Sequence, residues 1–346
     1  MGLCGHEQGL TGLPTALLCL AIRKGESRAT FAQEDRNRRR VPVHHRLFVR
    51  PVADPQHPHL LILHLDPVVF GVHFDRILSS NAWRENISID EFKFESEPLV
   101  RVAGWFLRPA KGGPFPTIVY VSEGNRNQVV QEGSQISEFA RKGFAVCAVD
   151  LRGIGLSMPH CPAAGPIYYH DSSLHERYVW AFFTLGKPVL GQRVWDFLCC
   201  LDYLQSRRDV DQSRIRGLGE KGAALAILLA GVLDDRLQSL LLDRPLATYQ
   251  SVVESEAYSL DLSWFLYSVL NHFDLPDLIG SLAPRPCWIL NAADSDGETL
   301  PQSEILARYT GAIEMFTKSD AGRQLRFIVC PEGEKAKIYS DWLQTF

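Results

Sequence analysis

The residues best placed to do chemistry lie in a glycine-rich turn between a short expected strand and an expected helix. Gly217, Gly219 and Gly222 have the G-x-G-x-x-G spacing typical of a dinucleotide-binding turn, where a pyrophosphate meets backbone N–H groups at a helix N-terminus. Asp243 ends the next expected strand about 20 residues later, where such a site places its ribose-binding acid. The spacing therefore makes nucleotide binding one hypothesis.

The strand before these glycines counts against nucleotide binding. Arg214 and Arg216 flank Ile215, whereas the central strand of a nucleotide-binding sheet is apolar. The turn also comes only after at least two strand–helix units. A lone glycine pattern of this kind is weak evidence, so nucleotide binding is kept as an alternative.

Glu220 lies inside the same turn, at the point where the helix begins. A carboxylate at a helix N-terminus is stabilised by the free N–H groups and the helix dipole, which is a purely structural role. Carboxylates also serve as covalent nucleophiles, so Glu220 is a candidate for that role too. Its base would then have to come from His160, His170, His175 or His272.

From about residue 87 onward, the apolar pattern alternates between short buried strands and amphipathic helices. The expected strands are 89–96, 99–108, 117–122, 144–150, 215–218, 239–243, 287–291 and 325–330. The expected helices are 131–142, 192–207, 223–233 and 331–346, with an aromatic-rich helical insertion at 249–278. The alternation predicts an α/β domain with a mostly parallel sheet between helices, and ligand sites beyond the carboxyl ends of its strands.

Residues 1–86 do not follow this alternation and are expected to form an N-terminal extension to a domain of residues 87–346. Residues 41–74 of the extension hold six histidines: His44, His45, His57, His59, His64 and His73. His57 and His59 would point the same way on a strand, which raises the possibility of a metal site. Because the spacing fits no standard site, structural or surface histidines are the favoured interpretation, and no metal is predicted.

The composition limits the classes of partner. The chain has 346 residues and a net charge of −4 with acids and bases mixed, which disfavours a nucleic-acid surface. Its eight cysteines include no CxxC pair, so buried free thiols and a reducing, cytoplasmic location are expected. The apolar run at 13–22 is interrupted by Pro14 and is too short to span a membrane.

Three stretches resemble the α/β-hydrolase superfamily and, more narrowly, bacterial acetyl-xylan-esterase-like proteins. They are AVDLRGIGLS (Ala148–Ser157), LDYLQSRRDVDQSRIRGLGEKGAALAIL (Leu201–Leu228) and DLPDLIGSLAPRPCWILNAADSDG (Asp274–Gly297). The resemblance covers roughly residues 89–346. It implies an α/β-hydrolase fold with a helical cap insertion, and an ester-hydrolase chemistry based on a serine, a histidine and an acid.

The resemblance places Glu220 where the nucleophilic serine would stand, because G-x-S-x-G-G-x-x-A overlays residues 218–226 without a gap. Asp294 or Asp296 takes the place of the catalytic acid. The histidine is expected after the last strand, but residues 331–337 contain none, and the last histidine of the chain is His272. Two of the three catalytic residues are therefore absent from their matched positions.

The same resemblance assigns the backbone amides of an oxyanion hole to Lys221 and to Glu123 or Gly124. The expectation is an α/β-hydrolase-like protein whose esterase chemistry is impaired or lost. The alternatives are an active ester hydrolase that uses Glu220 as nucleophile or base, and a dinucleotide-binding protein. No cofactor is predicted. The expected partner is a small ester or an acetylated carbohydrate rather than a nucleic acid or a membrane.

Overall fold

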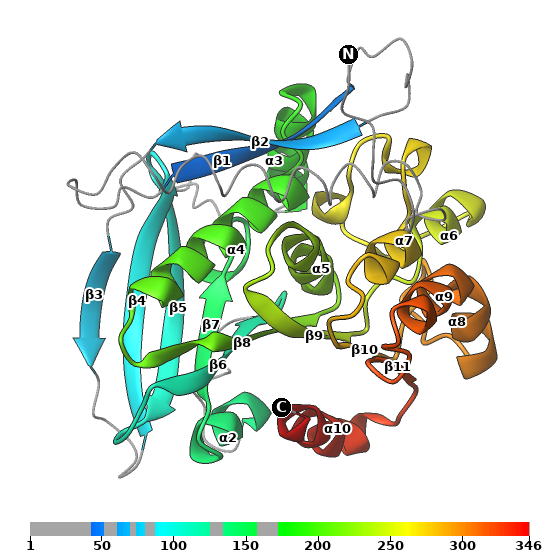
Figure 1. Cartoon of the computed structure of the whole chain (residues 1–346). Coiled ribbons are helices and arrows are strands. Elements are labelled where there is room, and N and C mark those ends of the chain that lie inside the picture. The colour runs from blue at the N-terminus through cyan, green and yellow to red at the C-terminus, as the bar shows by residue number, and fades with distance from the viewer. Residues whose placement is uncertain are drawn as a thin grey trace, which may run out of the picture.

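A computed structural model describes residues 43–51, 61–69, 74–79, 87–124, 134–157 and 172–345, with the backbone alone before residue 87. The main sheet has nine strands in the order β11-β10-β9-β8-β6-β7-β5-β4-β3 (Figure 1). They are β3 (Phe74–Ser79), β4 (Ile87–Glu97), β5 (Val100–Pro109), β6 (Phe115–Val121), β7 (Ala145–Asp150), β8 (Val210–Glu220), β9 (Leu237–Asp243), β10 (Cys287–Leu290) and β11 (Leu325–Ile328). The pairs from β7 to β11 are parallel and those from β3 to β7 antiparallel, which confirms the predicted mostly parallel sheet.

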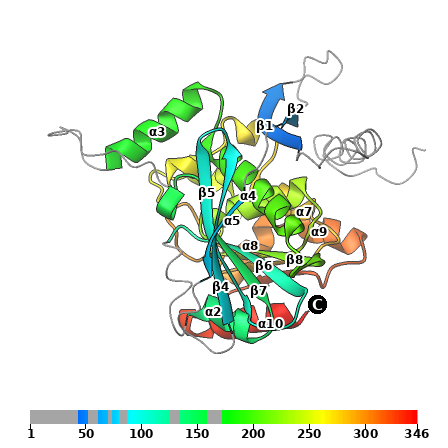
Figure 2. The same cartoon turned by 90° about the vertical axis from the view of Figure 1, so that its left-hand side faces the viewer.

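Helices cover both faces of the sheet (Figures 1 and 2). The α-helices of the described residues are α2 (Gln135–Arg141), α3 (Ser172–Thr184), α4 (Val189–Ser206), α5 (Ala223–Leu233), α6 (Tyr249–Glu254), α7 (Leu275–Gly280), α8 (Gln302–Arg308), α9 (Thr310–Lys318) and α10 (Lys335–Gln344). Helices α4 and α5 pack in one apolar cluster, and α2 and α10 pack in a second cluster on the opposite face. Both faces are closed, so a ligand site is expected at the carboxyl edge of the strands.

Burial follows directly from the local sequence. The strand β7, AVCAVD, is buried at every position, as a strand covered on both faces must be. Helix α5, AALAILLAGVL, is apolar on all sides and is buried from Ala223 to Val232. These two elements match the strand and the helix that the sequence predicts.

Close packing of α5 on β8 explains two of the three glycines in the turn. A Cβ atom on Gly217 would lie 2.7 Å from Ile227 Cγ2, and one on Gly219 would lie 2.7 Å from the Cα of Ala224. Real Cβ atoms do not come so close, so only glycine lets the helix approach the strand this tightly. In this structure, both glycines serve helix–strand packing.

The structure departs from the expected elements in three places. The predicted insertion at 249–278 is not one helix but α6, the 3₁₀ turns Leu262–Trp264 and Val269–Asn271, and the start of α7. Asp261 and Asp274 cap short helices there through side-chain hydrogen bonds to backbone N–H groups, which compete with a continuous helix. Helices α8 and α9 were not expected, and α3 begins inside a predicted loop.

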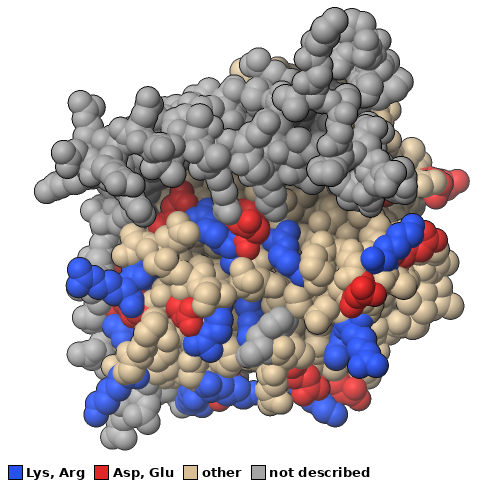
Figure 3. All heavy atoms as spheres, viewed as in Figure 1, with Lys and Arg blue, Asp and Glu red and all other residues tan. Residues whose placement is uncertain are grey.

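Part of the predicted N-terminal extension joins the main sheet. Strand β3 pairs antiparallel with β4, while β1 (Val43–Pro51) and β2 (Leu61–Val69) form a separate antiparallel pair. The domain boundary near residue 87 stays a prediction. No helix in the described part of the chain is long and apolar enough to cross a membrane. Acidic and basic side chains are interspersed on the face shown in Figure 3.

Candidate functional site

Each of three neighbouring parallel strands is followed directly by a residue with left-handed backbone geometry. Lys221 follows β8 with φ of 55°, Arg244 follows β9 with φ of 51°, and Asn291 follows β10 with φ of 51°. Each residue donates its backbone N–H to a carbonyl of the next strand, at 2.7, 2.7 and 2.8 Å respectively. The left-handed conformation costs a non-glycine residue about 1–2 kcal/mol, and here the continued ladder of hydrogen bonds holds it in place.

A pocket of about 350 Å³ lies at this edge of the sheet. It is lined by Glu123, Lys221, Gly222, Arg244, Leu246, Ser259, Leu260, Asp261, Ala293, Asp294, Ser295 and Gly297. The lining comes from the turns after β6, β8, β9 and β10 and from the insertion between α6 and α7. This is the edge where the sequence predicted a ligand site, and the volume suits a small organic molecule.

Glu220 does not line the pocket, although the sequence placed it in the nucleophile position. Successive side chains of a strand point to opposite faces, so Glu220 shares the face of Leu218, which packs in the cluster with α2 and α10. Its Oε1 lies 3.2 Å from the hydroxyl of Tyr339 in α10. The residues of this turn that line the pocket are Lys221 and Gly222.

Glu220 belongs to a buried polar cluster with Tyr120, Asp243, Lys335 and Tyr339. The hydroxyl of Tyr339 lies 2.7 Å from Asp243 Oδ2, and Lys335 Nζ lies 2.9 Å from the same oxygen. A hydroxyl has one proton to donate, so Asp243 and Glu220 share Tyr339 as a hydrogen-bond donor. Burial raises the pKa of Glu220, and the neighbouring Asp243 carboxylate adds to the rise, while Tyr120, Lys335 and Tyr339 oppose it.

Asp243 has a structural partner in this cluster rather than a position in the pocket. The dinucleotide hypothesis assigned it to a ribose, but its Oδ2 is shared between Lys335 and Tyr339. Lys335 lies in the segment 331–337, where the resemblance expects a catalytic histidine. The turn after the last strand thus supplies an ammonium group that binds a buried carboxylate.

The first amide of helix α5 already has an acceptor. Glu123, from the loop after β6, accepts a hydrogen bond from the Gly222 N–H with its Oε1 at 3.1 Å. A Cβ atom on Gly222 would lie 2.4 Å from the same oxygen and 2.3 Å from Trp264 Nε1, so glycine is required for this approach. Removal from water raises the pKa of Glu123, and nearby Lys221 and Arg193 act in the opposite direction.

Two of the three amides predicted for an oxyanion hole, those of Gly124 and Lys221, have partners inside the protein. The Gly124 N–H donates to Ser122 Oγ at 2.9 Å, and the Lys221 N–H donates to the Asp243 carbonyl at 2.7 Å. For Glu123, it is the side chain rather than the backbone amide that meets the turn. These amides are engaged inside the protein instead of being directed at a bound oxygen.

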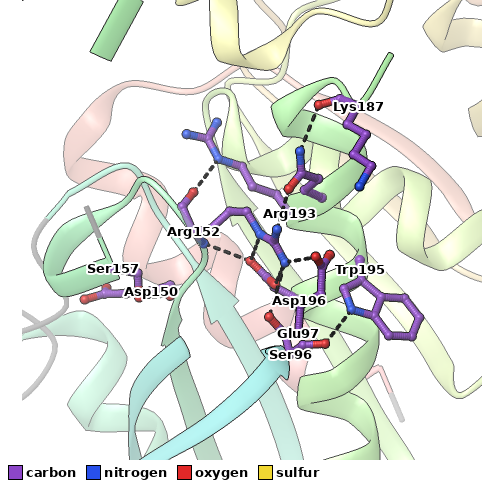
Figure 4. Close-up of polar contacts among 10 residues, drawn as sticks. Ser96, Glu97, Asp150, Arg152, Ser157, Lys187, Arg193, Trp195 and Asp196 are labelled. Carbon is purple, nitrogen blue, oxygen red and sulfur yellow. Dashed lines mark hydrogen bonds and ion pairs between the residues drawn. The ribbon is translucent and has the colours of Figure 1, made fainter. Parts of the chain in front are cut away.

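Two buried arginines, Arg152 and Arg193, make a set of polar contacts between α4 and the turn after β7 (Figure 4). Arg152, after β7, forms a two-point ion pair with Asp196 of α4, with Nη2–Oδ1 at 2.6 Å and Nε–Oδ2 at 2.8 Å. Arg193 of α4 donates to the Arg152 carbonyl at 3.1 Å and to Ser263 Oγ at 2.7 Å, and its guanidinium lies 3.9 Å from the centre of the Trp264 ring. Burial lowers the pKa of Arg193 to about 10. The contacts of Arg193 hold Trp264 in place beside Gly222 and Glu123.

The two predicted acids differ in their placement. Asp294 lines the pocket, and its Oδ1 accepts backbone N–H groups of Asp296 and Glu298, both at 3.0 Å. Asp296 is exposed in the same turn and is not among the lining residues. Asp294 therefore lies at the pocket, where its carboxylate also holds the loop 294–298 together through these hydrogen bonds.

Among the side chains that the structure describes, no histidine lines the pocket, so none is placed to act as a base there. His272 ends the 3₁₀ turn Val269–Asn271 and does not line the pocket. His175 lies in α3 with only its backbone described, and His160 and His170 lie outside the described residues. The side chains of the six histidines at 44–73 also lie outside the description. Among the described residues, no group of three or more histidine, cysteine or acidic side chains is arranged to hold a metal ion.

The free cysteines agree with the sequence prediction. Cys147, Cys199, Cys200 and Cys287 are buried thiols, and Cys330 is partly buried. The remaining three cysteines of the chain lie outside the described residues.

Comparison with known proteins identifies the class of fold. The chain is 23% identical over 249 residues to YtaP of Bacillus subtilis (strain 168), which is provisionally described as a hydrolase, and the match covers 66% of this chain and 78% of that one. The acetyl xylan esterase from Paenibacillus sp. R4 superposes with a TM-score of 0.59 at 18% identity, covering 98% and 96% of the two chains. A protein of Bacteroides fragilis NCTC 9343, provisionally described as an acetyl xylan esterase, gives a TM-score of 0.61 at 15% identity, covering 75% and 70%.

These likenesses confirm the predicted α/β-hydrolase fold, with acetyl xylan esterases among its structural neighbours. No model of a protein family matches the chain. The sequence identities are low enough that the structural matches establish the fold and not the activity.

Proposed function

We propose that this protein binds a small ester or acylated carbohydrate in its 350 Å³ pocket and does not turn it over as a serine esterase. The observation that carries the proposal is that the Lys221 N–H, the amide after the nucleophile position, donates to the Asp243 carbonyl at 2.7 Å. In an esterase, the amide after the nucleophile stabilises the negative oxygen of the tetrahedral intermediate. Here that amide is already engaged, and the Glu123 carboxylate on the next amide, that of Gly222, would repel a developing oxyanion.

The rest of the site supports the same proposal. Lys221 and Gly222 of the turn line the pocket, and Glu220 is held in the buried polar cluster. Lys335, in the segment where a catalytic histidine is expected, is paired with Asp243. Two of the three groups that a serine esterase needs, the serine and the histidine, are thus replaced by residues of the buried polar cluster.

The alternatives require larger changes. For Glu220 to act as nucleophile or base, its carboxylate would have to leave Tyr339 and cross from the α10 face of the sheet to the pocket. A dinucleotide would have to displace Glu123 from the first amide of α5. The packing of Gly217 and Gly219 against α5 accounts for those glycines without a ligand.

Hydrolysis of p-nitrophenyl acetate, a generic activated acetyl ester, by the wild-type protein beside Glu220→Gln and Lys221→Gln tests the proposal. We expect all three to hydrolyse the ester at rates near the uncatalysed background. Loss of a real rate in Glu220→Gln alone would establish an enzyme with a carboxylate nucleophile or base. Loss in Lys221→Gln alone would establish amine chemistry at the pocket. Either result would overturn the proposal.

A further inference from the structure

Two cationic residues, Lys221 and Arg244, line the pocket at adjacent strand ends. Glu220 of β8 is opposite Asp243 of β9 in the parallel register, so the next residues along each strand, Lys221 and Arg244, are also neighbours. Adjacent strands lie about 4.8 Å apart, so the Cα atoms from which the two side chains extend are close neighbours. Both residues line the same pocket, and both have the left-handed backbone described above.

The acidic residues of the pocket are engaged by backbone amides. Glu123 accepts from Gly222, Asp261 accepts from the Ser263 N–H at 2.8 Å, and Asp294 accepts from two amides of its own loop. The strand order β10-β9-β8-β6 puts Asp294 on one flank of the two cations and Glu123 on the other. Along the strand ends, Lys221 and Arg244 therefore lie in the middle, between Glu123 and Asp294.

Arg244 has only a loose ion pair among the described residues. Its Nη2 lies 3.7 Å from Glu332 Oε2, and that glutamate is 72% exposed and also pairs with Lys335 at 3.0 Å. An exposed pair at this distance contributes little energy, because solvent screens it. Lys221 is itself exposed, and the described residues place no acid within ion-pair distance of its Nζ. Among these residues, neither cation is held in a close ion pair, although Lys221 lies near enough to Glu123 to oppose the rise in the pKa of that carboxyl.

We propose that the pocket binds a small carboxylate anion, with Lys221 and Arg244 holding the carboxylate at the ends of β8 and β9. The proposal uses the pocket of the proposed function and makes a free carboxylate, rather than a neutral ester, the preferred small ligand there. The carbon skeleton of the ligand contacts Leu246, Leu260 and Ala293, which line the pocket with apolar atoms. Asp294 accepts a hydrogen bond from a hydroxyl group of the ligand, so a 2-hydroxy acid fits better than a simple fatty acid.

Calorimetric titration of the whole chain with lactate tests this assignment, with methyl lactate as the neutral ligand of nearly the same shape. We expect saturable lactate binding with a dissociation constant in the millimolar range, and binding of methyl lactate weaker by about tenfold or more. Lys221→Gln and Arg244→Gln should each weaken lactate binding by about tenfold, which is the loss of one charge-assisted contact. Lys318→Gln is the matched control, because it removes one exposed positive charge on α9 away from the pocket.

Three outcomes would overturn the inference. They are no saturable lactate binding by the folded wild-type protein, equal affinity for lactate and methyl lactate, or equal lactate affinity in all three variants. Circular dichroism melting of each variant shows that it is folded. Ester hydrolysis measured on the same preparations separates the two proposals, because turnover would overturn the proposed function and leave the carboxylate site standing.

Discussion

The Nζ of Lys335 lies 2.9 Å from Oδ2 of Asp243, and the two side chains are only 7% and 2% exposed. The pair joins the first residue of α10 to the carboxyl end of β9, close to the turns that form the pocket. Asp243 Oδ1 has no hydrogen-bond partner among the described residues, so Lys335 and Tyr339 provide most of its stabilisation. A buried carboxylate of this kind depends on its partners.

Lys335→Met should therefore destabilise the protein by about 3–5 kcal/mol, because it leaves Asp243 buried without its counter-charge. Urea unfolding followed by circular dichroism measures the change in the free energy of unfolding. Lys318→Met is the matched control, and it should cost less than about 1 kcal/mol, because the Lys318–Glu314 pair is exposed. The double variant Lys335→Met/Asp243→Asn should be more stable than Lys335→Met alone. An unchanged urea midpoint in Lys335→Met would contradict the role of the pair.

Glu220→Gln should alter how stability depends on pH. The folded-state pKa of Glu220 is raised above its ordinary value of 4.5. The stabilising contribution of the protonated carboxyl is therefore complete below that value and is lost as the pH rises through the folded-state pKa.

The glutamine variant keeps a neutral hydrogen-bonding group beside Tyr120 and Tyr339 and does not titrate. Relative to wild type, Glu220→Gln should gain stability as the pH rises, with a slope of at most about 1.4 kcal/mol per pH unit. Urea midpoints of both proteins between about pH 4 and about pH 8 measure this difference. A difference that stays constant over that range would show that Glu220 has the same pKa in the folded and unfolded chains.

Gly219→Ala should cost about 1–3 kcal/mol or more, because the new methyl group would overlap backbone atoms of Ala224 that cannot move without shifting α5. Gly311→Ala is the matched control in α9, where nothing lies within 4 Å of the new atom. That change should be neutral or stabilise the protein by up to about 1 kcal/mol, because alanine favours the helix. Thermal melting compares the two variants. Equal melting temperatures would mean that helix α5 does not need the glycine.

The spacing of apolar residues in the sequence predicted many of the strands and helices. The runs AVCAVD and AALAILLAGVL are apolar over lengths typical of a buried strand and a buried helix, and both elements lie where they were expected. The insertion at 249–278 was less predictable, because Asp261, Ser268 and Asp274 form caps and turns that interrupt its apolar pattern. Strand β3 was missed because its place depends on pairing with β4 rather than on the surrounding rhythm.

The sequence predicted where the candidate site lies, at the carboxyl ends of the strands. It did not predict which residue of the turn lines the pocket. Sequence alignment to the serine motif selected Glu220, whereas in the structure Lys221 lines the pocket. One signal was available beforehand: Leu218 and Glu220 are two residues apart, so they share a face of the strand, and Leu218 is a core residue. Nothing in the sequence indicates the left-handed conformation of Lys221, because that depends on its hydrogen bond to β9.

The amino-acid sequence by itself determined the class of fold, the glycines that bring α5 onto β8, and the absence of serine and histidine from the matched positions. These properties depend on residues close together in the chain or on their identity alone. Only the tertiary structure decided which groups replaced them. Glu123 reaches Gly222 across 99 residues, and Tyr339 reaches Glu220 across 119. Such contacts are set by how strands and helices pack, and no local pattern in the chain specifies them.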